Sequence, residues 1–298
     1  MEISGIFPAL TTPYREDGSI APELFAKNIT RYNRTGLSGY VVLGSTGESV
    51  MLSAAEGESL LAAAKEAAAP GKLLIAGTGA ESTAATITKT KRAAEFGYHV
   101  ALVKTPYYYK PAYKAETFIR HYRSVADASP IPLLLYSVPI FTGVALDTPE
   151  ILALSEHPNI IGIKDSSGVI QRVVEVASLA GPSFRVLTGG AAVLYPALAA
   201  GAKGAILALA SALPERCVAI YESWKSGRHP EALSQQQELA RASKIIVSEA
   251  GIGGLKYAMD VRGYHGGVPR LPLPTPSDAK KQQIHKLVTE FEPAAATA

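Results

Sequence analysis

Short apolar runs alternate with longer stretches of helical spacing along most of the 298-residue chain. Eight of these runs have the length of buried strands, and the stretches between them have the period of helices. The predicted strands are 5–10, 39–43, 73–77, 100–104, 133–136, 160–164, 185–188 and 204–207. Strands that alternate with helices are typical of a parallel α/β architecture. An open doubly wound sheet is the alternative, but near-regular spacing without a long central insertion favours a closed (β/α)₈ TIM barrel.

The last part of the chain predicts helices without further strands. Helical spacing covers 211–227, 231–249, 251–262 and 277–291, and the Pro-rich piece 268–276 is expected to be an extended connector. We therefore expect a barrel over 1–227 and a small C-terminal helical extension over 228–298. The low-complexity end, 293–298, is expected to be disordered.

Polar residues mark the starts of several predicted helices. Ser53 and Ser82 each precede a stretch of helical spacing, and Thr148 is followed by Pro149 and Glu150. Serine and threonine favour the N-cap, and proline favours the first helical turn. We expect a helix to begin after each of these three hydroxyl residues.

The composition excludes several classes of protein. The chain has 47% hydrophobic residues, 29 basic and 26 acidic residues, and a net charge of +3. The basic residues form no stripe with interleaved aromatics, so we expect no nucleic-acid partner. The single cysteine, Cys217, excludes an intramolecular disulfide and a thiol metal cluster, and is expected to be a small buried hydrophobe.

No stretch of the chain predicts a membrane span. The longest apolar stretch, 193–213, is interrupted by Pro196, Lys203 and several glycines, whereas a span needs about 20 continuous apolar residues. The first residues lack a charged, apolar, cleavable leader. We therefore expect a cytoplasmic protein without a membrane partner.

A lysine ends the sixth predicted strand. Because alternate residues of a strand share a face, Ile160, Gly162 and Lys164 are expected on one side and Ile161 and Ile163 on the other. Branched side chains suit the face covered by helices, and a glycine below the lysine leaves room inside a barrel. We expect Lys164 to point inward at the C-terminal mouth, where barrel active sites lie.

The strand before it ends in Tyr136, at the same level as Lys164. Burial among apolar side chains disfavours the charged form of an amine, and a neutral amine can attack a ketone to form an iminium. The adjacent carbon can then lose a proton or an aldehyde. A solvent-exposed lysine paired with an acid is the alternative, and Lys104, which lies off this pair, is a second candidate nucleophile.

Two polar segments follow other strands. The turn 44–49 (Gly-Ser-Thr-Gly-Glu-Ser) offers two hydroxyls and backbone N–H groups at a helix entrance, which suits a small carboxylate. A plain turn with an N-cap is the alternative. The tyrosines at 107–109 are expected to expose some of their hydroxyls, which indicates either a proton relay through a serine to Tyr136 or an aromatic surface or subunit contact.

Taken in order, four motifs resemble one family, the dihydrodipicolinate synthase / N-acetylneuraminate lyase family of class I aldolases. They are the turn 44–49, the Tyr-Tyr run before Lys110-Pro111, Tyr136-Ser137-Val138-Pro139-x-x-Thr142-Gly143, and Gly162-Ile163-Lys164-Asp165-Ser166. The resemblance runs from residue 5 to about residue 272. It implies a (β/α)₈ barrel with C-terminal helices, a homo-oligomer (tetramer or dimer), a small 2-oxo acid substrate such as pyruvate, and no metal or organic cofactor.

The resemblance also implies roles for individual residues. Lys164 would carry the Schiff base, Tyr136 would be the general acid/base, Ser45 would link it to a second tyrosine, and Tyr108 would be that tyrosine, lent by a neighbouring subunit. The implied substrate-binding residues are Thr46 with nearby amides for the pyruvate carboxylate, and Gly47, Ile206, Ser166, Gly189 and Phe141.

One departure from the family pattern bears on the second substrate. Dihydrodipicolinate synthases typically carry an arginine where this chain has Phe141, and a phenyl ring cannot form the bidentate pair that a guanidinium offers a carboxylate. The segments 135–139, 157–160, 251–256 and 263–267 instead look like 4-hydroxy-2-oxoglutarate aldolases. We predict that aldolase, which forms pyruvate and glyoxylate. The alternatives are dihydrodipicolinate synthase, a lyase or dehydratase of sugar-derived 2-oxo acids, and a non-catalytic ligand-binding barrel.

Overall fold

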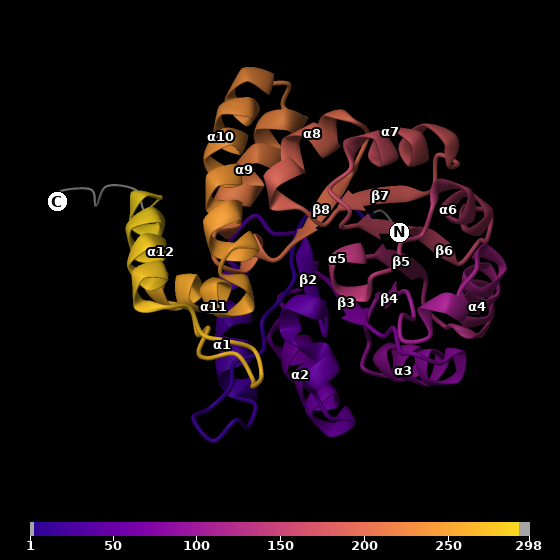
Figure 1. The fold of residues 1–298 in the computed structure, drawn as a ribbon, viewed down its shortest axis with the longest axis horizontal. Coiled ribbons are helices and arrows are strands. Elements are labelled where there is room, and N and C mark those ends of the chain that lie inside the picture. The colour runs from indigo at the N-terminus through magenta and orange to yellow at the C-terminus, as the bar shows by residue number, and fades with distance from the viewer. Residues whose placement is uncertain (1–2, 292–298) are drawn as a thin grey trace.

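The computed structural model describes residues 3–291 and has eight parallel strands at its centre (Figure 1). The strands are β1 Gly5–Pro8, β2 Gly39–Val42, β3 Leu73–Gly77, β4 Val100–Lys104, β5 Leu133–Ser137, β6 Ile160–Asp165, β7 Arg185–Thr188 and β8 Gly204–Leu207. All eight predicted strands are confirmed within two residues at each end. The second strand ends before Leu43, because that residue adopts a left-handed φ of 60°.

The strands close into a barrel. Each strand from β2 to β8 pairs with its sequence neighbour, and β8 also pairs with β1. The seam between β1 and β2 is bridged by Leu10 N–H to Val41 O at 3.0 Å and by Ser38 N–H to Ile6 O at 2.9 Å. The prediction of a TIM barrel rather than an open sheet is therefore confirmed.

The interior of the barrel is a layer of apolar side chains. Seven strands contribute to it through Phe7, Val41, Ile75, Leu102, Leu134, Leu187 and Ile206. Larger apolar layers fill the space between the strands and the surrounding helices. This packed interior leaves the ends of the strands as the place for polar side chains.

The predicted alternation fails at the start of β6. The pairing with β5 shifts register, so that Leu133 pairs with Ile160 but Leu134 pairs with Gly162. Because of this irregularity, Ile160 packs in the outer layer with Ile163, whereas Ile161 packs against the inner one. The predictions that Ile160 points inward and Ile161 outward were wrong, and the predicted alternation holds only beyond the bulge.

Helices surround the strands, as Figure 1 shows. They are α1 Pro22–Tyr32, α2 Ala54–Ala67, α3 Thr83–Glu95, α4 Ala115–Ala128, α5 Pro139–Thr142, α6 Thr148–Ser155, α7 Ile170–Leu179 and α8 Leu194–Ala199. Ser53 and Ser82 are N-caps as predicted, since their hydroxyls accept from Glu56 N–H and Ala85 N–H. Thr148 is instead the first helical residue, and its hydroxyl donates to Glu175 of α7 at 2.9 Å.

Beyond β8 the described chain is helical, as predicted. It forms α9 Pro214–Lys225, α10 His229–Ala242, α11 Gly251–Val261 and α12 Asp278–Glu290, and α12 lies to one side of the barrel (Figure 1). The expected helix 231–249 changes pitch, because Ser243–Ser248 forms a π-helix. The division of the chain at residue 227 stays a prediction, and the expected disordered tail lies outside the described residues.

None of the helices within residues 3–291 is long and apolar enough to cross a membrane.

Candidate active site

Lys164 and Tyr136 meet at the C-terminal ends of two adjacent strands. They are register partners of β6 and β5, and their residues are only 4% and 5% exposed. The Lys164 Nζ atom lies 4.2 Å from the centroid of the Tyr136 ring. The structure therefore places a buried primary amine against a phenol, which is the arrangement expected from the strand pattern.

Ser45 extends this pair to a third group. Its Oγ atom lies 3.4 Å from Tyr136 Oη, and either hydroxyl can donate. Ser45 lies after β2, in the 3₁₀ turn Ser45–Gly47. The Tyr136 ring thus contacts the Lys164 amine through its face, and its hydroxyl lies beside that of Ser45.

The space around Lys164 depends on a missing side chain at Gly189. A Cβ atom built there would lie 1.8 Å from Ser166 Oγ and 3.2 Å from Lys164 Cε. The Gly189 N–H donates to Asp165 O at 2.7 Å, so the backbone of this segment is held close to the end of β6. Ser166 and Gly189, both predicted to bind substrate, therefore line the wall beside the amine.

The turn that carries Thr46 and Gly47 is buried against the segment that follows β1. Both residues are buried, and the Gly47 carbonyl accepts from Thr12 Oγ1 at 2.7 Å. A Cβ atom at Gly47 would lie 2.9 Å from Leu10 O, which explains the glycine. Ile206, the remaining predicted contact from the strands, is fully buried in the inner layer with Tyr136.

The turn differs from the sequence-based prediction in two respects. It does not open a long helix, because 3₁₀ turns at Ser45–Gly47 and Ser49–Met51 precede α2. The Gly47 and Glu48 N–H groups are not free, since they donate to Gly44 O at 3.0 Å and Ser45 O at 3.1 Å. Those two amides are therefore unavailable to an anion in this conformation.

Two predicted site residues lie on the surface. Tyr108 is 72% exposed, and its ring contacts that of Tyr109 edge to face, with 5.0 Å between the centroids. Phe141 is 64% exposed and lies in α5, directly beyond β5. Within one chain the structure does not bring Tyr108 to Ser45, so its role stays a prediction that depends on a neighbouring subunit.

The second candidate nucleophile, Lys104, lies in different surroundings. Its Nζ is 3.7 Å from Glu81 Oε1 and 4.9 Å from the Tyr107 ring centroid. Burial lowers the pKa of Lys104, and Glu81 opposes that shift. These three residues line a cavity of about 740 Å³ that does not include Lys164 or Tyr136. Lys104 is the register partner of Tyr136 on β4, but its amine contacts Glu81 and Tyr107, whereas the amine over the Tyr136 ring is that of Lys164.

Within residues 3–291, no three His, Cys, Asp or Glu side chains form a group that could hold a metal ion.

Sequence reasoning missed a buried ion pair next to the Ser45–Gly47 turn. Glu48 and Lys256 form an ion pair of 2.6 Å with both side chains fully buried, and Arg270 contacts the same carboxylate through its backbone. The available signal was a lysine inside the largely apolar helix 251–261, since lysine is seldom fully buried unless it is paired. Its partner, 208 positions away in the chain, could not be read from local spacing.

The chain matches one protein family and is similar to several of its described members. The model of the dihydrodipicolinate synthetase family matches residues 2–291. A 4-hydroxy-tetrahydrodipicolinate synthase from Exiguobacterium sp. is 36% identical over 97% of this chain and 98% of its own. A probable mitochondrial 4-hydroxy-2-oxoglutarate aldolase from Emericella nidulans is 34% identical over 97% of this chain and 94% of its own. Other relatives at 32–34% identity are also named synthases.

Solved structures agree with this placement. Dihydrodipicolinate synthase DapA-2 from Bacillus anthracis superposes with a TM-score of 0.93 and 27% identity, covering 98% of this chain and 100% of that chain. YagE from Escherichia coli K12, a family protein solved in complex with pyruvate, has a TM-score of 0.90 and 27% identity, covering 96% of this chain and 98% of that chain. The barrel and its C-terminal helices are therefore shared with solved members.

Proposed function

Since this chain belongs to the dihydrodipicolinate synthetase family, whose members are lyases, we propose that Lys164 forms a Schiff base with the keto group of pyruvate. The observation that carries the proposal is the buried Lys164 amine, 4.2 Å from the Tyr136 ring centroid, with Ser45 Oγ 3.4 Å from the phenol oxygen. The pyruvate bound to YagE supports the choice of ketone.

The reaction follows from these three groups. The neutral amine of Lys164 adds to the ketone carbon, and water leaves to form the iminium. The iminium withdraws electrons from the neighbouring methyl carbon, which loses a proton to give an enamine. Tyr136 takes up and returns protons in these steps, with Ser45 orienting its hydroxyl. Thr46 and the start of its turn would hold the pyruvate carboxylate, and Ile206 would line the pocket.

The names of the relatives support one second substrate over the other. Synthases predominate among the relatives described above, which favours 4-hydroxy-tetrahydrodipicolinate synthase over the 4-hydroxy-2-oxoglutarate aldolase predicted from the sequence. In the synthase reaction the enamine carbon adds to the aldehyde carbon of aspartate semialdehyde, and the aldehyde oxygen takes up a proton. We therefore propose the synthase as the first candidate.

A specific observation keeps the aldolase as the second candidate. The exposed Phe141 stands beyond β5, where synthases typically carry the guanidinium that binds the carboxylate of the second substrate. The aldolase would cleave 4-hydroxy-2-oxoglutarate to pyruvate and glyoxylate through the same enamine. The relative from Emericella nidulans carries that name.

The proposal includes a homo-oligomer. Tyr108 projects into solvent beside Tyr109, and aromatic residues of this kind are enriched at protein interfaces. A neighbouring subunit could receive Tyr108 next to Ser45 and complete the proton relay. Size-exclusion chromatography with light scattering tests the assembly, and a monomer with full activity would contradict this role for Tyr108.

Trapping with borohydride tests the central step. Incubation with pyruvate and sodium borohydride should leave a reduced pyruvyl adduct on Lys164, detectable by peptide mass spectrometry. A family member with known activity serves as the positive control, and absence of the adduct under conditions that trap the control would overturn the mechanism. Pyruvate release from 4-hydroxy-2-oxoglutarate and condensation with aspartate semialdehyde, assayed side by side, then distinguish the two candidates.

A further inference from the structure

Glu48, directly after the active-site turn, is bound by charged residues of the C-terminal part of the chain. Glu48 follows the Ser45–Gly47 turn directly, and its Oε1 atom lies 2.6 Å from Lys256 Nζ of α11. Its Oε2 atom accepts from Arg270 N–H at 2.7 Å. The side chains of Glu48 and Lys256 are both 0% exposed. A fully desolvated ion pair therefore joins two parts of the chain next to the catalytic serine.

Stability alone does not account for this pair. Removing two charges from water opposes folding, and a well-packed apolar pair of similar volume is often at least as stable. Glu48 also has a left-handed φ of 56°, a conformation that disfavours residues other than glycine. Two unfavourable features thus coincide at one residue that adjoins Ser45. Strained, over-determined residues of this kind concentrate at functional sites.

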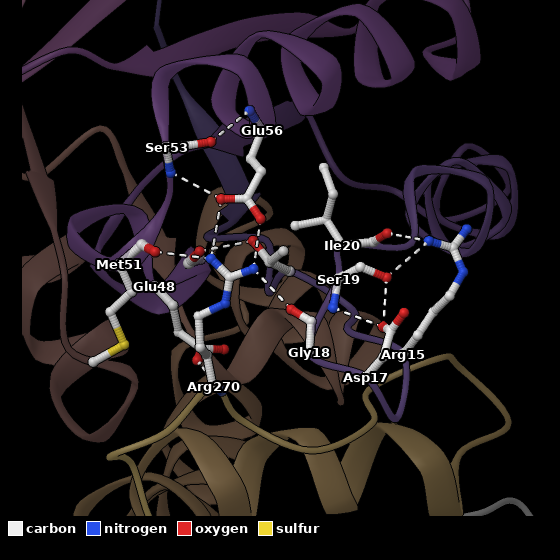
Figure 2. A network of polar contacts seen from close by, with 12 residues as sticks. Arg15, Asp17, Gly18, Ser19, Ile20, Glu48, Met51, Ser53, Glu56 and Arg270 are labelled. Carbon is white, nitrogen blue, oxygen red and sulfur yellow. Dashed lines mark hydrogen bonds and ion pairs between the residues drawn. The ribbon is translucent and has the colours of Figure 1, made fainter.

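The Arg270 side chain makes further contacts with the residues that follow Glu48 (Figure 2). Its guanidinium donates to Met51 O at 2.8 Å and to both carboxylate oxygens of Glu56. Glu56 in turn accepts from Ser53 N–H at 2.8 Å. The segment 48–56 is therefore held at several points by one arginine, which leaves its N-terminal end little freedom to shift.

The two cations are themselves connected. Lys256 Nζ donates to Val268 O at 2.8 Å, which ties α11 to the piece of chain that carries Arg270. Both cations lie over the Tyr14 ring, with Lys256 Nζ at 4.4 Å and Arg270 Cζ at 4.5 Å from its centroid. Cations over an aromatic face are attracted to it when they are desolvated. The unit formed by Glu48, Lys256 and Arg270 is called the anchor below.

We propose that the anchor positions the catalytic turn, an inference that rests on the function proposed above. The route is short: Glu48 N–H donates to Ser45 O at 3.1 Å, and Ser45 Oγ contacts Tyr136 Oη. Glu48, Lys256 and Arg270 are positioning residues, because they act on the reaction through Ser45 and Thr46. Helix α11 and the piece of chain that carries Arg270 then hold the turn of the proposed proton transfer in place.

The principal test neutralises the pair without changing its volume. The double variant Glu48→Gln with Lys256→Met should keep a melting temperature closer to that of the parent than Lys256→Met alone does, because it leaves no unpaired charge. Its remaining cost is the lost hydrogen bond to Val268 O. Its kcat should fall about 10- to 100-fold, since a misplacement near 1 Å can reduce a rate to that extent. The control Lys280→Met breaks the partly exposed pair with Glu249, which makes no contact with the turn, and should leave kcat unchanged.

A mutant cycle distinguishes positioning from a purely structural role. In a Ser45→Ala background the double variant should lower kcat by no more than about threefold further, because the hydroxyl that it positions is already missing. A kcat within twofold of the parent, or a full and additive loss in the Ser45→Ala background, would overturn the proposal. If the double variant does not fold, Arg270→Met carries the same cycle with an expected loss of about three- to tenfold.

Failure of the proposed function gives a different result. The parent protein would then form no borohydride adduct with pyruvate on Lys164. Failure of the anchor proposal alone leaves a parent that is trapped and turns over, with variants as active as the parent.

Discussion

Two buried lysines of this protein both lie over a tyrosine ring, but only one of them is paired with a carboxylate. Lys164 and Lys256 lie 4.2 Å and 4.4 Å from the ring centroids of Tyr136 and Tyr14. Lys256 faces the Glu48 carboxylate at 2.6 Å, whereas within residues 3–291 no carboxylate lies within 4 Å of the Lys164 amine. Burial lowers the pKa of Lys256 and Glu48 opposes that shift.

The difference separates an amine that is free to react from one that is committed to a contact. The Lys256 amine is held by its contact with the Glu48 carboxylate, and no such contact holds the Lys164 amine. Removal of the paired lysine leaves an uncompensated charge, whereas removal of the unpaired one leaves none. Substitutions at the two positions should therefore affect different properties.

The largest effect is expected for Lys164→Met on activity. Loss of the nucleophile should lower kcat by about 10⁴-fold or more and abolish the pyruvate adduct. The free energy of unfolding should change by no more than about 1 kcal/mol, because methionine fills a similar volume and no ion pair is broken. Turnover assays and urea denaturation check the two parts, and a large loss of stability would break the contrast with Lys256.

Lys256→Met should show the reverse profile in stability. It leaves the Glu48 carboxylate buried without its partner, which should lower the free energy of unfolding by about 3–5 kcal/mol in urea. Lys280→Met is the matched control, since its pair with Glu249 is partly exposed and should contribute less than about 1 kcal/mol. Equal losses in both variants would contradict a special role for the buried pair.

A third buried base, His121, extends the comparison to pH. Burial lowers its pKa to about 4; Glu81 opposes that shift and Lys104 adds to it. Between pH 6.5 and 4, His121 is protonated in the unfolded chain but stays neutral in the folded one. Stability therefore falls as the pH decreases through that window. From pH 7 to 5 the parent should lose about 2 kcal/mol more than His121→Gln, measured by denaturation at both values. An identical loss in the variant would mean that other groups govern the acid sensitivity.

The smallest effect is expected in α5, just beyond the C-terminal end of β5. Phe141→Arg supplies a guanidinium at an exposed position where synthases typically bind a carboxylate. Condensation with aspartate semialdehyde should rise about threefold relative to cleavage of 4-hydroxy-2-oxoglutarate, as measured by kcat/KM for both substrates. Phe141→Met is the control for loss of the ring. A parallel change in both reactions would show that this position does not discriminate between them.

Local sequence pattern predicted much of the barrel and the centre of the site. All eight strands were found because buried parallel strands are short apolar runs, and the shared level of Tyr136 and Lys164 follows from strand ends that lie at one mouth. The position of Ile160 was missed, because a bulge interrupts the period of two and has no consistent local sequence signal.

The anchor was beyond local reasoning for a different reason. Glu48, Lys256 and Arg270 meet only through the tertiary fold, and neither helical nor strand period relates residues so far apart. The same holds for Thr12, whose hydroxyl reaches Gly47 O from another strand end. The predicted role of Tyr108 depends on a second chain, so one chain cannot place it in the site.

The separation between Glu48 and Arg270 also orders events during synthesis. The ribosome releases the N-terminal strand, the serine turn and Lys164 long before residues 256 and 270 emerge. Until they do, Glu48 has neither of its partners, and the turn that carries Ser45 lacks the contacts made through Glu48. A nascent or truncated chain that contains Lys164 but ends before residue 270 therefore still lacks contacts that hold the turn.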